Sequence, residues 1–408
     1  MRTPSVQRNV IWLIVTEFVT RIILFAVVVW LTNSLGSKAY GQLSYVFAIA
    51  NLCVVIADFG LHTYVTRLVA GSLQDWQQQR RTIVYLKLLG SAVALLLTVG
   101  IVTWRSSLDL LTIAAGAVAI IAVSGRTFSE AIARGRQRMH LEASSKLVHT
   151  ALQALALSLA LLWQLPLEEI ALAYAISALL GWLFSLRLVK AELTSPRTSS
   201  TLSVGQLISA VMPFAASIAI NAQFNYLDSA ILGWLRPAEE VGWYTAAYKP
   251  IFFITSLAGL VIASFFPRIA QLWKAGQYAE AKQTVRKLLR TLMLAGWPMA
   301  VVGTVVAPWL FSFLYKPEYA PAVIPFTILL WNTLAIYFWA PLGNSLQAIG
   351  QEKVYARNFI LAAIVNAPLT LICVWQWAYI GAAIATLCTQ LLLAALMYRD
   401  ARRHLLTN

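Results

Sequence analysis

The stretch GQLSYVFAIANLCVVIADFGLHTYVTR, residues 41–67, has a counterpart of equal length in GWYTAAYKPIFFITSLAGLVIASFFPR, residues 242–268. Each stretch begins with Gly, continues as a mainly apolar segment and ends with Arg. Equal lengths with matched end residues favour an internal duplication of the chain. We therefore predict two domains, an N-terminal and a C-terminal bundle of six helices each, at residues 1–200 and 201–408.

The composition places these segments in a membrane. Hydrophobic residues make up 60% of the 408 residues, charged residues only 12%, and the mean hydropathy is +0.71. Apolar segments of about 20 residues, the length that crosses the hydrocarbon core as a helix, recur along the whole chain. We predict twelve spans, at residues 9–34, 41–66, 83–104, 108–129, 146–165, 168–189, 204–235, 241–267, 288–314, 321–347, 354–376 and 378–398.

The predicted fold is an all-α polytopic membrane protein. No segments of alternating polarity suggest a membrane barrel, so a bundle of helices is expected. Because each half has an even number of spans, the second half enters the membrane in the same direction as the first. Parallel repeats of this kind are related by an axis along the membrane normal, and transporters place the substrate path at their interface. We expect a central cavity there.

The formal net charge of +15 suggests a nucleic-acid partner, but the distribution of the charges argues against one. Most of the 31 Lys and Arg residues lie in every second connection and in the two tails, and few lie in the alternate connections. This asymmetry follows the positive-inside rule. It predicts that both termini are cytoplasmic.

The sequence contains no recognisable catalytic or cofactor motif. It has no nucleotide-binding loop, no His and Cys at metal-ligand spacing, and no Ser-His-Asp set placed where it could act. The connections on the outer side are about a dozen residues or fewer, which is too short for a catalytic or receptor domain. We expect a protein that is not an enzyme and that uses no cofactor and no metal.

The first predicted span contains TEFVTRIILF, residues 16–25, in which Glu17 and Arg21 are four residues apart. An ionised side chain near the bilayer centre costs about 2.5–3.5 kcal/mol on insertion scales, so such residues pair or face a wet cavity. An acid four residues before a base is the favourable order for a pair within one helix. Two interpretations stay open. The pair neutralises itself so that the helix can insert, or it faces the wet cavity and has a functional role there.

The seventh predicted span contains NAQFNYLDSAILGW, residues 221–234, and the eighth contains Lys249. At a rise of about 1.5 Å per residue, Asp228 and Lys249 lie at similar depths in the membrane. We predict that they pair across adjacent antiparallel helices. Their contact is either a structural ion pair or a substrate or gating contact.

Further polar residues within the spans are candidates for lining the same cavity. Amide side chains hydrogen-bond sugars readily. The candidate substrate-binding residues are Arg21, Lys249, Arg126, Asn221, Asn225 and Asn366. The candidates for ion pairing or ion coupling are Glu17, Asp58 and Asp228.

Three stretches of the chain carry a family resemblance. They are LTNSLGSKAYGQLSYVFAIANLCVVIADFGLHTYVTR (31–67), LDSAILGWLRPAEEVGWYTAAYK (227–249) and LQAIGQEKVYARNFILAAIVNAPLTLICVWQWAYIGAAIAT (346–386). They resemble the polysaccharide transporters, or O-antigen (Wzx-type) flippases, of the multidrug/oligosaccharidyl-lipid/polysaccharide (MOP) exporter superfamily. The resemblance extends in pattern over essentially the whole chain, and twelve spans in two halves of six match it.

The resemblance implies that the protein moves an undecaprenyl-diphosphate-linked oligosaccharide from the cytoplasmic to the outer leaflet by alternating access, for synthesis of cell-surface polysaccharide such as the O-antigen of lipopolysaccharide. It implies a multi-pass protein of the bacterial cytoplasmic (inner) membrane. The implied partners are the lipid-linked oligosaccharide, membrane lipids, a polysaccharide polymerase and the chain-length machinery. In the family the cavity is cationic, and Arg21, Lys249 and Arg126 are the positions here that could meet phosphate. On this resemblance, Glu17 and Arg21 project into the cavity, and Arg21 binds phosphate when substrate displaces Glu17. The three carboxylates named above offset those charges.

Two other functions stay open at this point. An ion-coupled multidrug exporter of the same superfamily would use Glu17 and Asp228 as cation or proton sites. An intramembrane glycan polymerase or acyltransferase belongs to a different class. Such enzymes typically present a large outer loop or an embedded acid/His pair, and neither is visible in this sequence.

Overall fold

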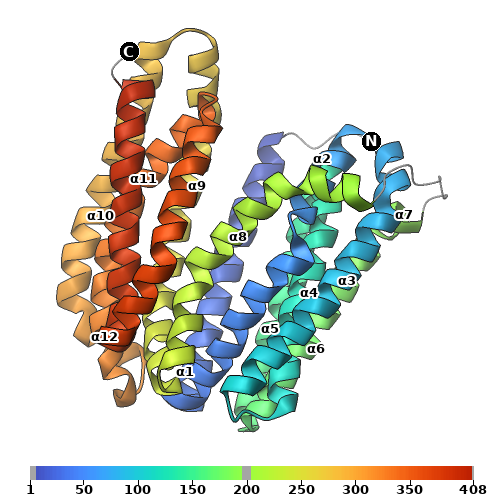
Figure 1. Cartoon of the computed structure of the whole chain (residues 1–408), viewed down its shortest axis with the longest axis vertical. Helices are drawn as coiled ribbons and strands as arrows, with labels where there is room; N and C mark the ends of the chain where they lie inside the picture. Colours follow the sequence, from blue (N-terminus) through green and yellow to red (C-terminus); the bar gives the residue numbers. More distant parts are fainter. Residues whose placement is uncertain (1–5, 195–203, 407–408) are drawn as a thin grey trace. The chain divides into compact units, whose positions relative to one another are not determined.

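The computed structural model describes residues 6–194 and 204–406, and these residues form helices and short connections without a β-strand (Figure 1). The long helices are α1 (Val6–Asp58), α3 (Leu73–Arg105), α4 (Leu110–Gly135), α5 (Met139–Leu162), α6 (Leu167–Leu188), α8 (Val204–Leu235), α9 (Ala238–Lys274), α10 (Tyr278–Leu314), α11 (Val323–Ala348) and α12 (Glu352–Ala401). The shorter elements are α2 (Leu61–Gly71), α7 (Lys190–Thr194), the 3₁₀ helix Pro317–Ala322 and the π-helical turn Arg402–Leu406.

Ten of the described helices are long and apolar enough to cross a membrane. Two of them are interrupted by a residue with non-helical dihedral angles, Gly36 in α1 (φ 77°, ψ 169°) and Ala378 in α12 (φ 53°, ψ −134°). Each interruption divides its helix into two segments of spanning length, so the described chain supplies the twelve predicted spans. The prediction of an all-helical polytopic fold is confirmed.

The second predicted span differs from the structure at its C-terminal end. We expected an unbroken helix over residues 41–66, but the helix ends at Asp58 and α2 begins at Leu61. Phe59 and Gly60 both have positive φ, at 36° and 81°. A Cβ on Gly60 would lie 2.6 Å from the Cβ of Phe214 in α8, so the close approach of α8 requires glycine here.

The described residues fall into two compact units. The first comprises the described parts of Met1–Leu35 and Gln42–Tyr226, and the second those of Gly36–Gly41 and Leu227–Asn408. The predicted domain boundary at residue 200 lies outside the described residues, and the division of the sequence at that point stays a prediction.

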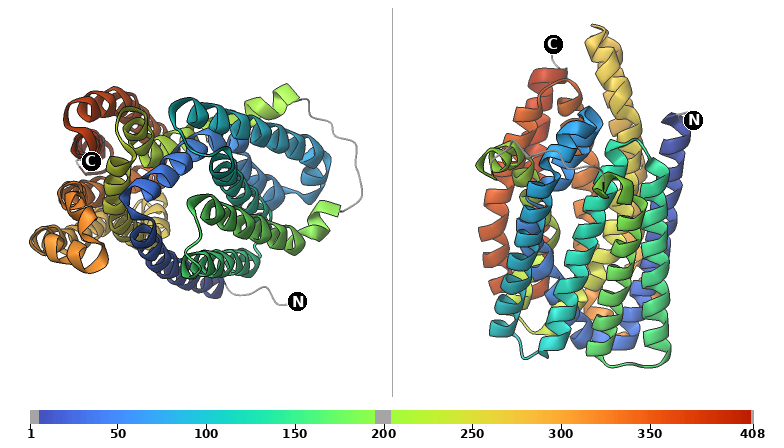
Figure 2. Two further views of the ribbon diagram at one scale, coloured as in Figure 1. Left: turned by 90° about the horizontal axis from the view of Figure 1, so that it is seen from below. Right: turned by 90° about the vertical axis from the view of Figure 1, so that its right-hand side faces the viewer.

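In the first unit, α4 is the most buried of the long helices. It packs against α3, α5 and α6, which run beside it in Figure 2. Small residues make this packing possible, since a Cβ on Gly125 would lie 2.4 Å from the Trp182 ring of α6. At one end, Trp76, Phe128 and Ile132 join a buried hydrophobic cluster, and the Trp76 indole donates a hydrogen bond to the Glu192 carbonyl oxygen at 3.2 Å.

In the second unit, α12 folds back on itself at Ala378, and its two segments pack against α11 (Figure 1). The reversal leaves carbonyl oxygens at the end of the first segment without helical donors. Arg236 supplies the missing donors, because its guanidinium donates to the carbonyl oxygens of Val374 at 3.2 Å and Trp375 at 2.5 Å.

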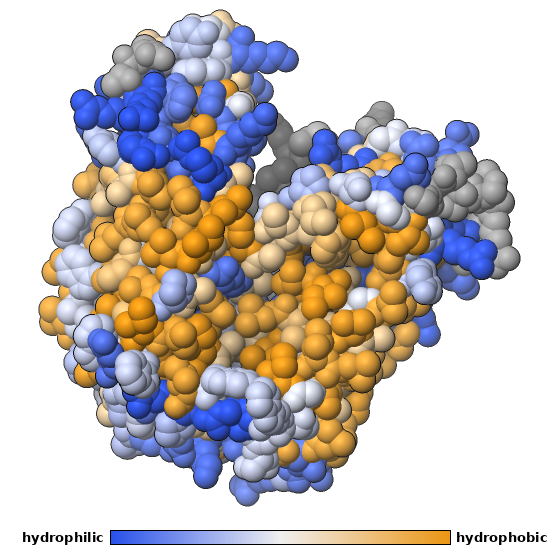
Figure 3. Space-filling model, viewed as in Figure 1, coloured by the Kyte–Doolittle hydropathy of each residue, from blue (hydrophilic) through white to orange (hydrophobic). Residues whose placement is uncertain are grey.

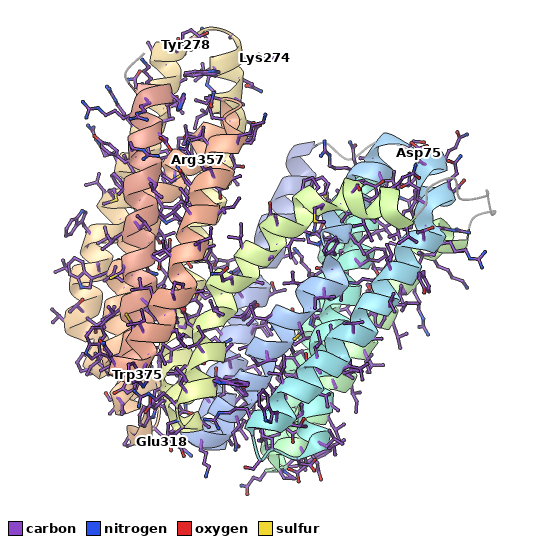
Figure 4. All side chains as sticks on the ribbon, viewed as in Figure 1. Asp75, Lys274, Tyr278, Glu318, Arg357 and Trp375 are labelled. Atoms are coloured by element: carbon purple, nitrogen blue, oxygen red, sulfur yellow. The ribbon has the colours of Figure 1, made fainter. Side chains whose placement is uncertain are left out.

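The surface of each unit has the polarity of a membrane protein. Orange residues cover the middle of the helices in Figure 3, and blue residues gather at the helix ends. In the second unit, Lys274 and Tyr278 lie at one end of the helices, and Glu318 and Trp375 lie at the other (Figure 4). Arg357 lies between them, nearer to the end with Lys274 and Tyr278.

The two glycines that begin the repeated stretches meet in the second unit. A Cβ on Gly41 would lie 1.7 Å from the Ala238 carbonyl oxygen, and a Cβ on Gly242 would lie 2.2 Å from the Ser37 carbonyl oxygen. Residues 36–41 therefore approach the start of α9 at a distance that only glycine allows.

We expect Gly41→Ala to disrupt this contact and sharply reduce the yield of monodisperse protein in gel filtration. Gly100→Ala in α3 is the matched control, because a Cβ there meets no atom within 4 Å. That control should be neutral or slightly stabilising, since alanine is favoured over glycine within a helix by about 1 kcal/mol. Equal yields of the two variants would contradict the proposed close contact.

Candidate functional site

Five charged residues of α1, α4 and α5 form a continuous set of ion pairs in the first unit. We call this set the charge network, and it consists of Glu17, Arg21, Arg134, Glu142 and Lys146. Three bases share two carboxylates, so the network carries one excess positive charge.

Glu17 lies between two of these bases. Its Oε1 is 2.6 Å from Arg21 Nη2, which confirms the predicted pair within α1, and its Oε2 is 3.4 Å from Lys146 Nζ of α5. The side chains of Arg21, Glu17 and Lys146 are 26%, 27% and 28% exposed, respectively. These three charged groups are therefore neither sealed within the helix packing nor freely solvated.

Glu142 connects this part of the network to the end of α4. Arg134 donates to both of its carboxylate oxygens, at 3.0 and 2.7 Å, in a bidentate arrangement. Lys146 Nζ lies 3.2 Å from Glu142 Oε1, so Lys146 bridges the two carboxylates. Glu142 itself is only 3% exposed, and its two partners compensate the cost of burying its charge.

Arg126 and Glu130 form a separate pair within α4. Arg126 Nη1 contacts Glu130 Oε1, and the Ser145 hydroxyl donates to the same oxygen at 2.8 Å. Both side chains are at least nine-tenths buried. The sequence-predicted residue Arg126 is therefore engaged with a carboxylate inside the helix packing and does not join the charge network.

Asp58 has a basic partner in α3, Lys87, which was not among the site residues predicted from the sequence. Lys87 Nζ of α3 lies 2.8 Å from Asp58 Oδ1 and 2.5 Å from the Ser124 hydroxyl of α4. The Lys87 side chain is 7% exposed, so this cation lies inside the helix packing. His62 Nδ1 lies 3.3 Å from the other carboxylate oxygen of Asp58.

Asp228 is buried in the second unit among hydroxyl groups. Its carboxylate accepts hydrogen bonds from Tyr244 of α9 at 2.9 Å and from two residues of α12, Thr370 at 3.1 Å and Thr386 at 2.5 Å. No basic side chain among the described residues forms an ion pair with it. A buried carboxylate with three hydroxyl donors and no base can gain a proton or a cation without breaking an ion pair.

The predicted ion pair between Asp228 and Lys249 is wrong. The two residues occupy adjacent helices, as expected from their depth, but the helix face that meets Asp228 is that of Tyr244. Lys249 is five residues further along α9, which places it about 140° around the helix axis from Tyr244. Its side chain is half-buried and has no acidic partner among the described residues.

The predicted amide residues fall in both units. In α8, the Asn225 amide donates to the Asn221 carbonyl oxygen at 2.7 Å, and Asn221 is exposed. In α12, Asn366 lies one turn before Thr370 and donates to Thr389 at 3.2 Å. The Asn366 side-chain oxygen is buried and has no hydrogen-bond donor among the residues that the structure describes.

The site residues predicted from the sequence did not include Lys146, Glu142 or Arg134. A local signal could have found Glu142 and Lys146, because they are four residues apart, as Glu17 and Arg21 are. Lys146 begins the predicted span 146–165, and Glu142 lies just before it. Lys146 and Glu17 are 129 positions apart, and no local pattern predicts that contact. Thr370 and Thr386 likewise become visible as Asp228 ligands only when α12 folds back.

The fold is that of the MOP-superfamily transporters. A lipid II flippase, MurJ, in an inward closed conformation superposes with a TM-score of 0.75 at 12% identity, over 95% of this chain and 87% of that one. An inward-facing multidrug-resistance MATE family transporter of the MOP superfamily superposes with a TM-score of 0.73 at 13% identity, over 95% and 94% of the two chains. At these identities the likeness concerns the fold alone.

The family follows from the sequence. The profile of the polysaccharide biosynthesis protein family matches residues 6–273, more than half of the chain, and the MatE profile matches residues 213–372. This chain belongs to the polysaccharide biosynthesis protein family, and the resemblance to polysaccharide transporters is confirmed. These families contain transporters and flippases rather than catalytic enzymes.

Two archaeal proteins are similar over part of the chain. The probable low-salt glycan biosynthesis flippase Agl15 of Haloferax volcanii is 24% identical over 164 residues, 40% of this chain and 34% of that protein. The uncharacterized membrane protein MJ1068 of Methanocaldococcus jannaschii is 24% identical over 163 residues, 40% of this chain and 32% of that protein. The matched region thus spans about a third of the length of each relative.

Proposed function

We propose that this transporter moves a lipid-linked oligosaccharide, joined through a diphosphate to an undecaprenyl chain, from the cytoplasmic to the outer leaflet. The observation that carries the proposal is the charge network, in which three half-buried or partly exposed bases share two carboxylates within the first unit. An excess positive charge at this position suits a substrate whose head group contains an anionic diphosphate. The glycan flippase among the relatives supports the same class of substrate.

The chemistry of such a substrate explains why a protein is needed. A diphosphate and many sugar hydroxyls cannot cross hydrocarbon unpaired, because each group would lose its hydrogen bonds to water. A polar surface that supplies cations and hydrogen-bond donors replaces that water, while the hydrocarbon tail stays in the lipid. Alternating access then presents the polar surface to one leaflet at a time.

The first binding step is an exchange of anions. Glu17 holds Arg21 through one oxygen and Lys146 through the other, so one phosphate group that displaces Glu17 gains two cations at once. The two phosphates of the diphosphate together offer four non-bridging oxygens and two negative charges, against two oxygens and one charge for the Glu17 carboxylate, which favours the exchange. Lys146 keeps its contact with Glu142 during this step, and therefore stays in position.

The other candidate residues take different places in this proposal. Lys249 is a second phosphate contact, because it is half-buried and has no acidic partner among the described residues. Asn221, Asn225 and Asn366 supply amide groups for sugar hydroxyls. Arg126 is buried against Glu130, and this favours a packing role over contact with substrate.

We place this activity in two parallel halves, residues 1–200 and 201–408, around a hydrated cavity. The asymmetry of the positive charges supports cytoplasmic termini. The cytoplasmic (inner) membrane of a bacterium, a role in O-antigen or related polysaccharide synthesis, and a polymerase with chain-length machinery as partners complete the proposal.

Reconstituted vesicles test the proposed substrate against the alternative exporter function. We expect the purified protein to move a fluorescent undecaprenyl-diphosphate-linked oligosaccharide between leaflets and to leave cationic dyes where they are. Accessibility of the glycan to an added lectin measures the first activity, and dye fluorescence measures the second. Dye efflux without glycan movement would identify a multidrug exporter instead.

Asp228 favours ion coupling as a second element of the function. Its buried carboxylate lacks a base among the described residues and is surrounded by three hydroxyl groups. The Asn366 side-chain oxygen, one turn before Thr370 in α12, has no donor among the described residues. Oxygen atoms of this kind suit a proton or a small hard cation. Uptake and release of that ion would bias the second unit between two states during transport.

Asp228→Asn should remove the dependence of transport on an ion gradient. Asparagine keeps the shape of the side chain and can still accept hydrogen bonds, but it cannot take up a proton or neutralise a cation. Transport rates measured with and without an imposed proton or sodium gradient should become equal in this variant. Tyr244→Phe, which removes one donor and keeps the carboxylate, should retain gradient dependence; retention in Asp228→Asn would contradict the coupling role.

A further inference from the structure

An apolar groove of about 590 Å³ lies on the second unit between α10, α11 and α12. Two aromatic pairs border it, Trp297 with Trp331 and Phe338 with Tyr398, each with ring centroids 5.9 Å apart. The side chains of Leu391, Trp297 and Tyr398 are exposed to about half of their full extent, so the groove is open along its length.

The shape of the groove suits a hydrocarbon chain. Its lining residues on α12 extend from Leu387 to Tyr398. At about 1.5 Å per residue this is on the order of 16 Å, roughly half the thickness of the hydrocarbon core. A groove with apolar walls, whose length matches the thickness of one leaflet's hydrocarbon, accommodates an extended acyl chain.

A cationic cluster lies immediately beyond the Tyr398 end of the groove. Asp400 is 2% exposed and accepts hydrogen bonds from Arg357 at 2.6 Å, Asn358 at 2.9 Å and Arg399 at 3.2 Å. The two arginine side chains are 52% and 47% exposed, respectively, so each guanidinium keeps N–H groups that face outward. Two bases and one acid leave an excess positive charge.

Asp400 gives this cluster a fixed geometry. A buried carboxylate that contacts two guanidinium groups fixes the orientation of both. An isolated arginine on the surface has no such fixed orientation. Arg357 lies toward the end of the unit that carries Lys274 and Tyr278, where the apolar band gives way to polar residues (Figures 3 and 4). This is the depth at which a phospholipid places its phosphate.

We propose that the groove and the Arg357–Arg399 pair together bind one anionic phospholipid. The acyl chain lies in the groove, the aromatic pairs border it, and the phosphate accepts hydrogen bonds from both guanidinium groups. Basic sites between membrane helices favour anionic head groups over zwitterionic ones by charge. The site belongs to the second unit alone and is independent of the transported substrate.

Photo-crosslinking tests the site in the full-length protein. A benzophenone amino acid replaces Leu391 in the groove, and the same residue replaces Val305 of α10 in a control, since Val305 is 77% exposed and does not line the groove. The protein is reconstituted in vesicles of equimolar phosphatidylglycerol and phosphatidylcholine without any polyprenyl lipid. After illumination, mass spectrometry identifies the attached lipid.

We expect several-fold enrichment of phosphatidylglycerol over phosphatidylcholine at position 391 and a ratio near that of the bilayer at position 305. Arg357→Gln combined with Arg399→Gln and Asp400→Asn should abolish the enrichment without leaving a buried unpaired carboxylate. Ala395→Trp, which fills the groove and leaves the cluster intact, should reduce crosslinking of both lipids at position 391. Equal ratios at the two positions, or enrichment that persists in the triple variant, would overturn the proposal.

Discussion

Replacing Arg21 by alanine is expected to lower the rate of glycan flipping by roughly 10- to 100-fold. The guanidinium makes a charge-assisted contact with Glu17, and we propose that it makes the same kind of contact with the substrate phosphate. Such contacts are worth about 1.5–3 kcal/mol each, which corresponds to that range of rates when the contact is made on the way to the transition state. The lectin-accessibility assay in reconstituted vesicles measures the rate.

A double variant separates this role from mere neutralisation of the pair. Glu17→Gln with Arg21→Gln leaves no unpaired charge in α1, so the helix should insert and the protein should fold. If Arg21 serves only to neutralise Glu17, this variant transports at the normal rate. We expect it to be as slow as Arg21→Ala, because the cation that meets phosphate is missing in both.

Two single substitutions complete the comparison. Glu17→Gln removes the competing anion and should retain transport, with the substrate bound at least as tightly. Arg187→Ala removes an exposed arginine at the end of α6 and should leave the rate unchanged. Equal loss in Arg187→Ala and Arg21→Ala would mean that general charge, and not the charge network, sets the rate.

The second large effect concerns stability and the buried pair of Lys87 with Asp58. Replacing Lys87 by methionine should destabilise the protein by about 3–5 kcal/mol, because Asp58 would keep its charge in a buried site. His62, at 3.3 Å from Asp58, is the remaining partner, and it is charged only when protonated. Thermal unfolding followed by gel filtration should show a markedly lower midpoint for Lys87→Met.

Restoring neutrality should recover most of that loss. In Asp58→Asn with Lys87→Met, neither position carries a charge, and replacing a buried ion pair by uncharged side chains is often nearly neutral. We expect the midpoint of the double variant to lie close to that of the unmodified protein. A double variant as unstable as Lys87→Met would show that the ion pair's contribution is not electrostatic.

Hydropathy predicted most of the fold because each span must be apolar over its whole length. The break at Gly36 falls between two predicted spans, and the break at Ala378 falls on the first residue of the last predicted span, since polar or turn-forming residues separate the apolar segments there. The break at Phe59–Gly60 was missed, because the glycine needed there serves a contact with Phe214 that no local pattern contains. Long-range packing, and not helix propensity, ends that helix.

Only those site contacts that depend on spacing within one helix could be predicted from the sequence. Glu17 and Arg21 share a helix face at a four-residue spacing, and their pair could be predicted from that alone. Asp228 and Lys249 were placed at the right depth, but depth does not determine which face of α9 meets α8. Lys146 was missed as a partner of Glu17, since that contact depends on how α5 packs beside α1.

The central claim is that the charge network faces water within the membrane. We test it with Arg21→Cys in a protein whose native cysteines at positions 53, 373 and 388 are replaced by alanine. A membrane-impermeant thiol reagent applied to vesicles that expose the cytoplasmic side should label position 21 and should not label Val305→Cys, a control on an exposed apolar surface of α10. Labelling at position 21 no faster than at position 305, when both react with a permeant reagent, would contradict the account.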